Sequence, residues 1–195
     1  MTRDEVLGVF RESGALLEGH FLLSSGRHSG HYLQCARVLQ NPHRAACLAE
    51  ALAATLPAQL RASVDKVVSP AMGGVIIGHE MGRALSKNAV FLERPTGTFE
   101  LRRGFTVEPG ERVLLVEDVV TTGLSSREAI AAVHALGGKV VAEVALVDRT
   151  GGSVDLGVPF FPLIAIDFPT YTEDKVPPAL AAVPVTKPGS RTEAA

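Results

Sequence analysis

The stretch VLLVEDVVTTGLSSREAI, residues Val113–Ile130, decides which fold this sequence is expected to adopt. Four apolar residues lead into two adjacent acids, Glu117 and Asp118, and a run of Thr, Gly and Ser then leads into a helical pattern. Short apolar runs of this kind are typical of strands buried on both faces of a parallel sheet. The stretch therefore predicts a strand, a polar loop and a helix, and it raises the question of what two acids do at a buried strand end.

The same alternation of strand and helix patterns extends on both sides, from Asn41 to Asp148. A helix is expected from Asn41 to Pro57, because Asn41 is a capping residue and Pro42 suits the first helical position. Further apolar strands are expected in VDKVVSP, NAVFLER, KVVAEVALVDR and FFPLIAID. This order predicts an α/β fold, with a central, mainly parallel sheet and helices on both faces.

Three other segments complete a single expected domain, residues 1–195. A helix capped by Thr2 is predicted before Gly14, and HFLLSSGRHSGHYLQC predicts two short strands around a Ser/Gly turn. Residues 94–108 have no strong period and are expected to form a flexible loop. The tail, approximately residues 186–195, is expected to be frayed.

Composition narrows the classes of partner. The 195 residues carry a formal net charge of -2, so a nucleic acid is not expected as a partner. No apolar stretch approaches the roughly 20 residues that cross a bilayer, and the first residues lack the pattern of a secretory signal. Two cysteines, Cys35 and Cys47, do not make a disulfide framework; we expect a cytoplasmic protein with both cysteines in its core.

In a parallel sheet, ligands bind at the carboxyl ends of the strands, where three loops are expected: SPAMGG, EDVVTTGLSS and DRTGG. The second loop fits neither of the common glycine-rich nucleotide motifs. Backbone N–H groups at a helix start nevertheless attract a phosphate, and hydroxyl groups add donors. Those hydroxyls belong to Thr121, Thr122, Ser125 and Ser126.

The two acids would repel a phosphate, so they fit a different part of the ligand. A diol that donates hydrogen bonds, or a divalent cation, suits Glu117 and Asp118. A phosphorylated sugar presents both a phosphate and a diol. The plainer interpretation is a solvated strand end followed by a helix cap, but the hydroxyl-rich helix start directly after a buried strand favours the functional one.

The 13 residues VLLVEDVVTTGLS resemble, at every position, the phosphoribosyl pyrophosphate signature of the type I phosphoribosyltransferases. The resemblance implies that the two acids hold the ribose hydroxyls and that the Thr-Thr-Gly loop holds the 5-phosphate. It also implies Mg²⁺, held mainly by the substrate with Glu117 or Asp118 as an additional ligand, and a cis bond between Ala71 and Met72. The residues expected to bind phosphoribosyl pyrophosphate are Glu117, Asp118, Val119, Val120, Thr121, Thr122, Gly123, Leu124, Ser125, Arg94, Ala71, Met72 and Gly73.

Within that family, HFLLSSGRHSGHYLQ, LRRGF and VDRTGG are similar to segments of the orotate phosphoribosyltransferases, and the resemblance extends from Val6 to about Phe168. It implies transfer of the phosphoribosyl group to orotate in pyrimidine synthesis, by a homodimer. It also implies a small hood over the site, formed by approximately residues 1–40 and part of 155–185. Many relatives carry lysine at the positions of Ser24 and Gly73, which is a departure in this sequence.

The residues expected to bind orotate are Arg149 and, as the resemblance implies, Thr121 at the base edge. A lone arginine after a strand is usually a surface charge, but a planar guanidinium suits the carboxylate of orotate. Arg94, Arg102 and Arg103 form a cluster that would usually be a solvated face. Because Gly97 and Gly104 accompany them in a long loop before the phosphate strand, we expect a lid that brings cations to the leaving pyrophosphate. The expected catalytic residues are Asp118, Glu117, Arg102 and Arg103.

Two alternatives stay open from the sequence alone. A purine phosphoribosyltransferase would share the sugar-phosphate motif but has no use for an arginine that meets a carboxylate. A ligand-sensing regulator that retains the motif would be expected to carry an added basic face or domain.

Overall fold

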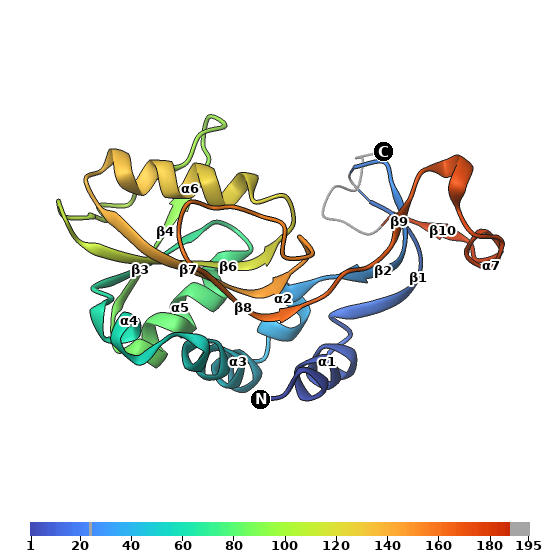
Figure 1. The fold of residues 1–195 in the computed structure, drawn as a ribbon, viewed down its shortest axis with the longest axis horizontal. Helices are drawn as coiled ribbons and strands as arrows, with labels where there is room; N and C mark the ends of the chain where they lie inside the picture. Colours follow the sequence, from blue (N-terminus) through green and yellow to red (C-terminus); the bar gives the residue numbers. More distant parts are fainter. Residues whose placement is uncertain (24, 188–195) are drawn as a thin grey trace.

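The computed structural model describes residues 1–23 and 25–187, so Ser24 and the expected frayed tail from residue 188 onward lie outside the described residues. The chain forms a large six-stranded sheet and a separate small sheet of four strands (Figure 1). The strands are β1 (Leu16–Leu22), β2 (His28–Leu33), β3 (Lys66–Pro70), β4 (Asn88–Glu93), β5 (Glu100–Leu101), β6 (Arg112–Val120), β7 (Lys139–Asp148), β8 (Phe160–Ala165), β9 (Thr170–Tyr171) and β10 (Val185–Thr186). The helices are α1 (Arg3–Glu12), α2 (Cys35–Leu39), α3 (Pro42–Thr55), α4 (Ala58–Ser63), α5 (Gly74–Leu85), α6 (Leu124–Ala135), α7 (Pro178–Ala181) and the 3₁₀ helix η1 (Glu173–Lys175).

The large sheet has the strand order β5-β4-β3-β6-β7-β8, and every neighbouring pair is parallel except β4 with β5. Its central strands are buried on both faces, because their side chains are almost all apolar. The sheet confirms the predicted α/β fold, and it brings the ends of β3, β6 and β7 to one edge.

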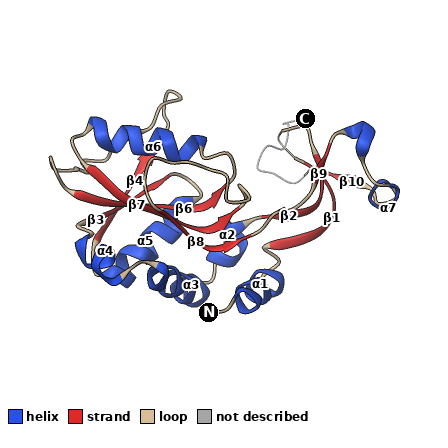
Figure 2. Ribbon diagram, viewed as in Figure 1, coloured by secondary structure: helices blue, strands red, loops and turns tan. Residues whose placement is uncertain are grey.

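Helices cover both faces of this sheet (Figure 2): α6 lies on one face, and α3, α4 and α5 lie on the other. Two apolar cores result. Leu115 and Val133 belong to the core under α6, whereas Leu114, Val116 and Ile77 belong to the core under α3 and α5. Side chains alternate along β6 between the two cores, as the pleat of a strand requires.

The helix starts follow the sequence signals. Thr2 and Glu5 form a reciprocal capping box on α1, and the side chain of Asn41 accepts hydrogen bonds from the backbone N–H groups of His43 and Arg44. The short helices α2 and α4 were not predicted. Neither has a side-chain cap in the structure, so the strongest local start signal is missing from both.

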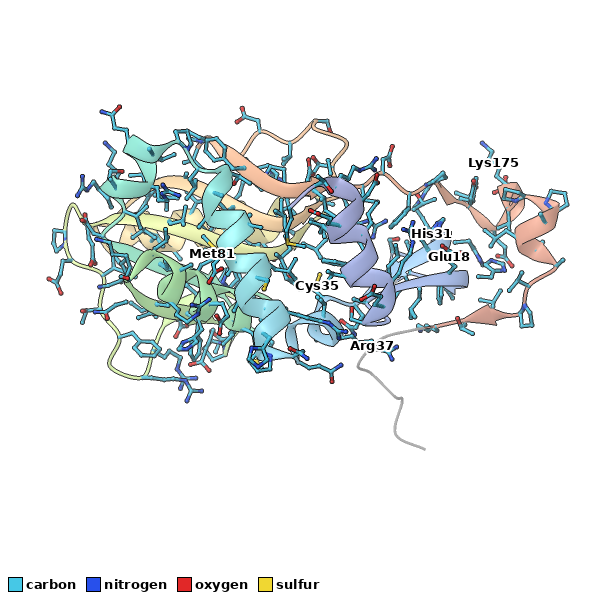
Figure 3. The ribbon with its side chains drawn as sticks, turned by 90° about the horizontal axis from the view of Figure 1, so that it is seen from below. Glu18, His31, Cys35, Arg37, Met81 and Lys175 are labelled. Atoms are coloured by element: carbon cyan, nitrogen blue, oxygen red, sulfur yellow. The ribbon has the colours of Figure 1, made fainter. Side chains whose placement is uncertain are left out.

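The small sheet has the order β10-β1-β2-β9 and projects from one end of the large sheet (Figure 1). Strands β1 and β2 form the predicted antiparallel pair, in which Glu18 pairs with His31 (Figure 3). The chain returns at its end to add β10, where Thr186 pairs with Phe21. This return gives Thr186, at the approximate start of the expected frayed tail, a hydrogen-bond partner on β1.

Within the described part of the first 40 residues, β1 and β2 are the strands that belong to the small sheet. Helices α1 and α2 contribute to the same core as α3 and α5, through residues such as Phe10 and Val38. Cys35 is buried in this core (Figure 3). Cys47, also expected in the core, is exposed, because it lies on the outer face of α3.

Residues 94–108 are more regular than the sequence indicated. The segment contains β5, which pairs with the end of β4, and Val107 is buried in the core under α6. The sequence of this segment shows no hydrophobic period because its strand, β5, has only two residues. Along the described ranges 1–23 and 25–187, no helix has the length and apolar character required to cross a bilayer.

Candidate active site

A cavity of about 370 Å³ opens at the carboxyl ends of β3 and β6, a typical volume for a small-molecule site. It brings together two of the three loops expected at this edge. Its lining is Pro70, Ala71, Gly73, Arg94, Phe99, Glu117, Asp118, Val119, Val120, Thr121, Thr122, Gly123, Leu124, Ser125 and Ser126. Met72, Arg102, Arg103 and Arg149, which the sequence also predicted for the site, do not line this cavity.

The two acids at the end of β6 face this cavity from a desolvated position. Glu117 is only 6% exposed, and its pKa is raised to about 9 by burial, by Asp118 and by Glu143. Burial also raises the pKa of Asp118, although its Oδ1 accepts a hydrogen bond from the N–H of Val119 at 2.9 Å. Burial disfavours the charged forms, so both acids gain from a ligand that donates hydrogen bonds or carries positive charge.

The loop after these acids turns into α6 at Gly123, where φ is 71°. A Cβ atom there would lie 2.6 Å from Val154 and 2.8 Å from Leu156, so glycine satisfies both the backbone conformation and the space. The Thr122 hydroxyl accepts from the N–H of Leu124, and Arg127 donates to the Thr122 carbonyl at 3.0 Å. Arg127 thus holds the loop in place. The start of the 12-residue helix α6 lines the cavity, where its backbone N–H groups can bind an anion.

One hydroxyl predicted as a phosphate donor is used elsewhere. Ser126 donates its Oγ–H to Oε1 of Glu143, at 2.6 Å, and both side chains are buried. The sequence correctly placed Ser126 at the start of the helix. It did not predict that Glu143 would be its partner, because Glu143 lies on a different element, the strand β7.

The first loop, after β3, comes very close to Asp118. A Cβ on Gly73 would lie 2.6 Å from Asp118 Oδ1, so the glycine leaves room for this carboxylate. The peptide bond between Ala71 and Met72 is cis, as the family resemblance implied. Met72 is 84% exposed and is not among the residues that line the cavity.

Of the three predicted lid arginines, only Arg94 lines the cavity. Its guanidinium lies 3.9 Å from the ring centroid of Phe99, pairs with Glu128 and donates to Ser125 Oγ at 3.4 Å. Arg103 instead donates two hydrogen bonds to Glu93, at 2.8 and 3.0 Å. Arg102 is exposed beside it. These cations are therefore near the site in sequence but not at the cavity of their own chain.

Arg149 lies beside the phosphate loop, because β7 pairs with β6 and the N–H of Arg149 donates to the Val120 carbonyl at 2.8 Å. Its guanidinium carbon lies 5.7 Å from the ring centroid of Phe168. Its Nε–H is buried without a hydrogen-bond partner in the described protein, and burial lowers the pKa of the group. A half-buried cation with an unused donor is suited to an anionic ligand.

Phe168 joins this arginine to the small sheet. The ring of His31 on β2 stacks on Phe168, with centroids 4.3 Å apart and planes 6° apart. Sequence reasoning identified neither Phe168 nor Phe99, because their partners are 137 and 5 positions away and no motif includes them. It also missed Arg127 and Glu143, and the only available signal for Glu143 was an acid in the middle of the otherwise apolar run VVAEVALV.

The donors suit a cation that is shared with a ligand. Among residues 1–23 and 25–187, no three His, Cys, Asp or Glu side chains gather as a metal site. Glu117 and Asp118 are adjacent acids with raised pKa values, and no Lys or Arg of the described part of the chain pairs with either, which fits a Mg²⁺ ion whose other ligands are oxygens of the substrate.

Comparison with known proteins agrees with this geometry. Residues 36–157 match the family model described as the phosphoribosyl transferase domain. The chain is 69% identical over 193 residues to the orotate phosphoribosyltransferase of Novosphingobium aromaticivorans, covering 99% of this chain and 100% of the relative. It is also 69% identical over 196 residues to that of Sphingopyxis alaskensis, with 100% of both chains covered.

Among solved structures, the orotate phosphoribosyltransferase from Aeropyrum pernix is similar, with a TM-score of 0.71, 29% identity and coverage of 83% of this chain and 93% of that one. The large sheet with its two helical layers is thus the type I phosphoribosyltransferase fold. By its signature loop, its fold and its full-length relatives, this chain belongs to the orotate phosphoribosyltransferase family.

Proposed function

We propose that this chain transfers the 5-phosphoribosyl group of phosphoribosyl pyrophosphate to orotate, giving orotidine 5-monophosphate and pyrophosphate in pyrimidine synthesis. The observation that carries the proposal is the pairing of two features at one sheet edge. The acids and phosphate loop of β6 fit the sugar phosphate, and the unpartnered Nε–H of Arg149, on the neighbouring strand, fits the carboxylate of orotate. Full-length relatives that are 69% identical carry the name of this enzyme.

The sugar phosphate is held from two sides. Glu117 and Asp118 accept hydrogen bonds from the ribose hydroxyls, and the N–H groups from Thr121 to Ser125 bind the 5-phosphate at the start of α6. This places the anomeric carbon between the base and the leaving pyrophosphate. Positive charge develops at that carbon as pyrophosphate departs, so the protein acts mainly by alignment and needs no covalent nucleophile.

The departing pyrophosphate gathers negative charge, which cations stabilise. Arg94 lines the cavity and is placed for this role. We propose that Arg102 and Arg103 join it when the segment 94–108 closes, which requires Arg103 to leave Glu93. We propose Mg²⁺ as the cofactor, held mainly by the substrate with Glu117 or Asp118; when bound, it neutralises phosphate charge.

We further propose that the active form is a cytoplasmic homodimer. Arg102 and Arg103 lie outside the cavity of their own chain, which supports a lid that serves a neighbouring subunit. The two free cysteines support a reducing compartment. Sedimentation of a fully active monomer under assay conditions would refute the dimer.

The reaction is tested with orotate, uracil, hypoxanthine and adenine, each mixed with phosphoribosyl pyrophosphate and Mg²⁺ while nucleotide formation is followed. We expect turnover of orotate and little of the others. Turnover of a purine without turnover of orotate would make the substrate assignment wrong. Omitting Mg²⁺ or adding a chelator should abolish the reaction.

A further inference from the structure

Glu143 is a buried acid for which the reaction above has no use. It lies in the middle of β7, its exposed fraction is 0%, and its Oε2 has no hydrogen-bond partner among the described residues. Burying a carboxyl group with one oxygen unsatisfied costs free energy, and an apolar residue would suit the surrounding core. The position therefore calls for an explanation.

The other oxygen of Glu143 holds the phosphate-binding helix. Oε1 accepts the hydrogen bond from Ser126 Oγ at 2.6 Å. Ser126 is 1% exposed, belongs to the first turn of α6 and lines the cavity with the phosphate loop. This short bond links β7 to the helix turn whose N–H groups face the cavity.

Glu143 is also close to the acid that faces the sugar. In the ladder between β6 and β7, Glu143 pairs with Leu115, and Ala145 pairs with Glu117. Since side chains alternate along a strand, Glu143 and Glu117 lie on the same face of the sheet, the face covered by α6. Glu143 therefore lies on the strand next to the one that carries the acid pair, and its bond to Ser126 ties the helix start to that strand.

We propose that Glu143 is a positioning residue for the sugar-phosphate site, which holds the first turn of α6, through Ser126, in register with the acids of β6. The inference rests on the proposed function, since it assigns the α6 turn to phosphoribosyl pyrophosphate. It predicts an effect on that substrate and none on orotate, which binds at Arg149.

The test compares four single variants and one double variant in direct binding and in turnover. Ser126→Ala removes the hydroxyl alone, Glu143→Leu replaces the acid with an apolar side chain of similar size, and Glu143→Gln keeps an acceptor for Ser126. Val133→Ala is the control, because Val133 is buried on the same helix but does not line the cavity. The Kd of phosphoribosyl pyrophosphate with Mg²⁺ is measured by calorimetry without a base, and KM is measured for each substrate.

We expect Ser126→Ala and Glu143→Leu each to raise the Kd and KM of phosphoribosyl pyrophosphate about 3- to 10-fold, as expected for loss of one fixed hydrogen bond. The KM of orotate should stay within about 2-fold of that of the unmodified enzyme. Glu143→Gln should recover most of the loss, and the double variant Ser126→Ala/Glu143→Leu should be no weaker than Glu143→Leu alone, because both remove one interaction.

A purely structural role gives a different pattern. If Ser126→Ala and Glu143→Leu lower Tm as Val133→Ala does and leave the Kd of phosphoribosyl pyrophosphate unchanged, the proposal is wrong. Equal changes for both substrates overturn it as well. If Glu143→Leu does not fold, Ser126→Ala decides the matter by itself. Failure of the proposed function is separate: the unmodified chain would then bind phosphoribosyl pyrophosphate without turning over orotate.

Discussion

Replacing Arg149 by alanine should separate binding of the base from binding of the sugar phosphate. The guanidinium is half-buried, its Nε–H has no hydrogen-bond partner among the described residues, and its carbon lies 5.7 Å from the ring centroid of Phe168. In the complex it would donate two hydrogen bonds to the orotate carboxylate. Removing one member of such a desolvated charge pair costs about 2–5 kcal/mol, which is a loss of roughly 30- to 4000-fold in kcat/KM for orotate.

The assay is steady-state formation of orotidine 5-monophosphate, with each substrate varied in turn. The KM of phosphoribosyl pyrophosphate should change little, because that substrate binds the loop after β6. Arg149→Lys should give an intermediate loss, since lysine keeps the charge but not the planar pair of donors. Arg112→Ala is the matched control, because Arg112 pairs with Asp65 at the opposite end of β6.

A second measurement isolates the carboxylate itself. Uracil is orotate without that group, so the ratio of kcat/KM for orotate over uracil should collapse in Arg149→Ala. An unchanged ratio, or an equal rise in the KM of orotate and of phosphoribosyl pyrophosphate, would refute the reasoning. Arg149 would then be a structural cation near Asp167, whose negative charge raises the pKa of Arg149 while burial lowers it.

Four further predictions concern the acids and the loops. Asp118→Asn should keep the fold and Tm but lower kcat/KM about 100-fold or more, as steady-state kinetics beside thermal unfolding would show; a stable variant with full activity contradicts the assignment. Gly73→Ala should displace the Asp118 carboxylate, because the new Cβ would lie 2.6 Å from Oδ1, and should lower kcat about 10- to 100-fold; normal turnover would mean that the loop shifts at no cost. Arg103→Ala should lower kcat more than it raises the KM of orotate, since the cation is needed most as pyrophosphate departs, whereas Glu93→Ala, which frees Arg103, should not reproduce that loss. Burial raises the pKa of Glu143 from its ordinary 4.5 to about 7, so between these pH values the folded protein retains a proton that the unfolded chain releases. The free energy of unfolding should therefore fall, as pH rises through this range, by up to about 1.4 kcal/mol per pH unit. Thermal unfolding of Glu143→Gln at about pH 5 to 8 should show a shallower fall than the unmodified protein, and an identical slope would contradict the shift.

The sequence by itself determined the large sheet and the sugar-phosphate loop, because both depend on local pattern. A run such as VLLV predicts a buried strand from its own residues, and Asn41 followed by Pro42 starts a helix without distant help. Glu117, Asp118 and the Thr-Thr-Gly loop are contiguous, so the chain order alone places them at one strand end.

Only the tertiary structure decided which distant side chains act together. Ser126 was expected to meet a phosphate, but a strand 17 residues further along the chain offers it Glu143. Arg103 was expected on a lid that brings cations to the pyrophosphate, and the structure pairs it with Glu93 at the end of β4. The stack of His31 on Phe168, and the return of β10 to β1, join segments more than 130 residues apart. Local sequence cannot encode such contacts, because each depends on the register and spacing of strands that meet only after the chain has folded.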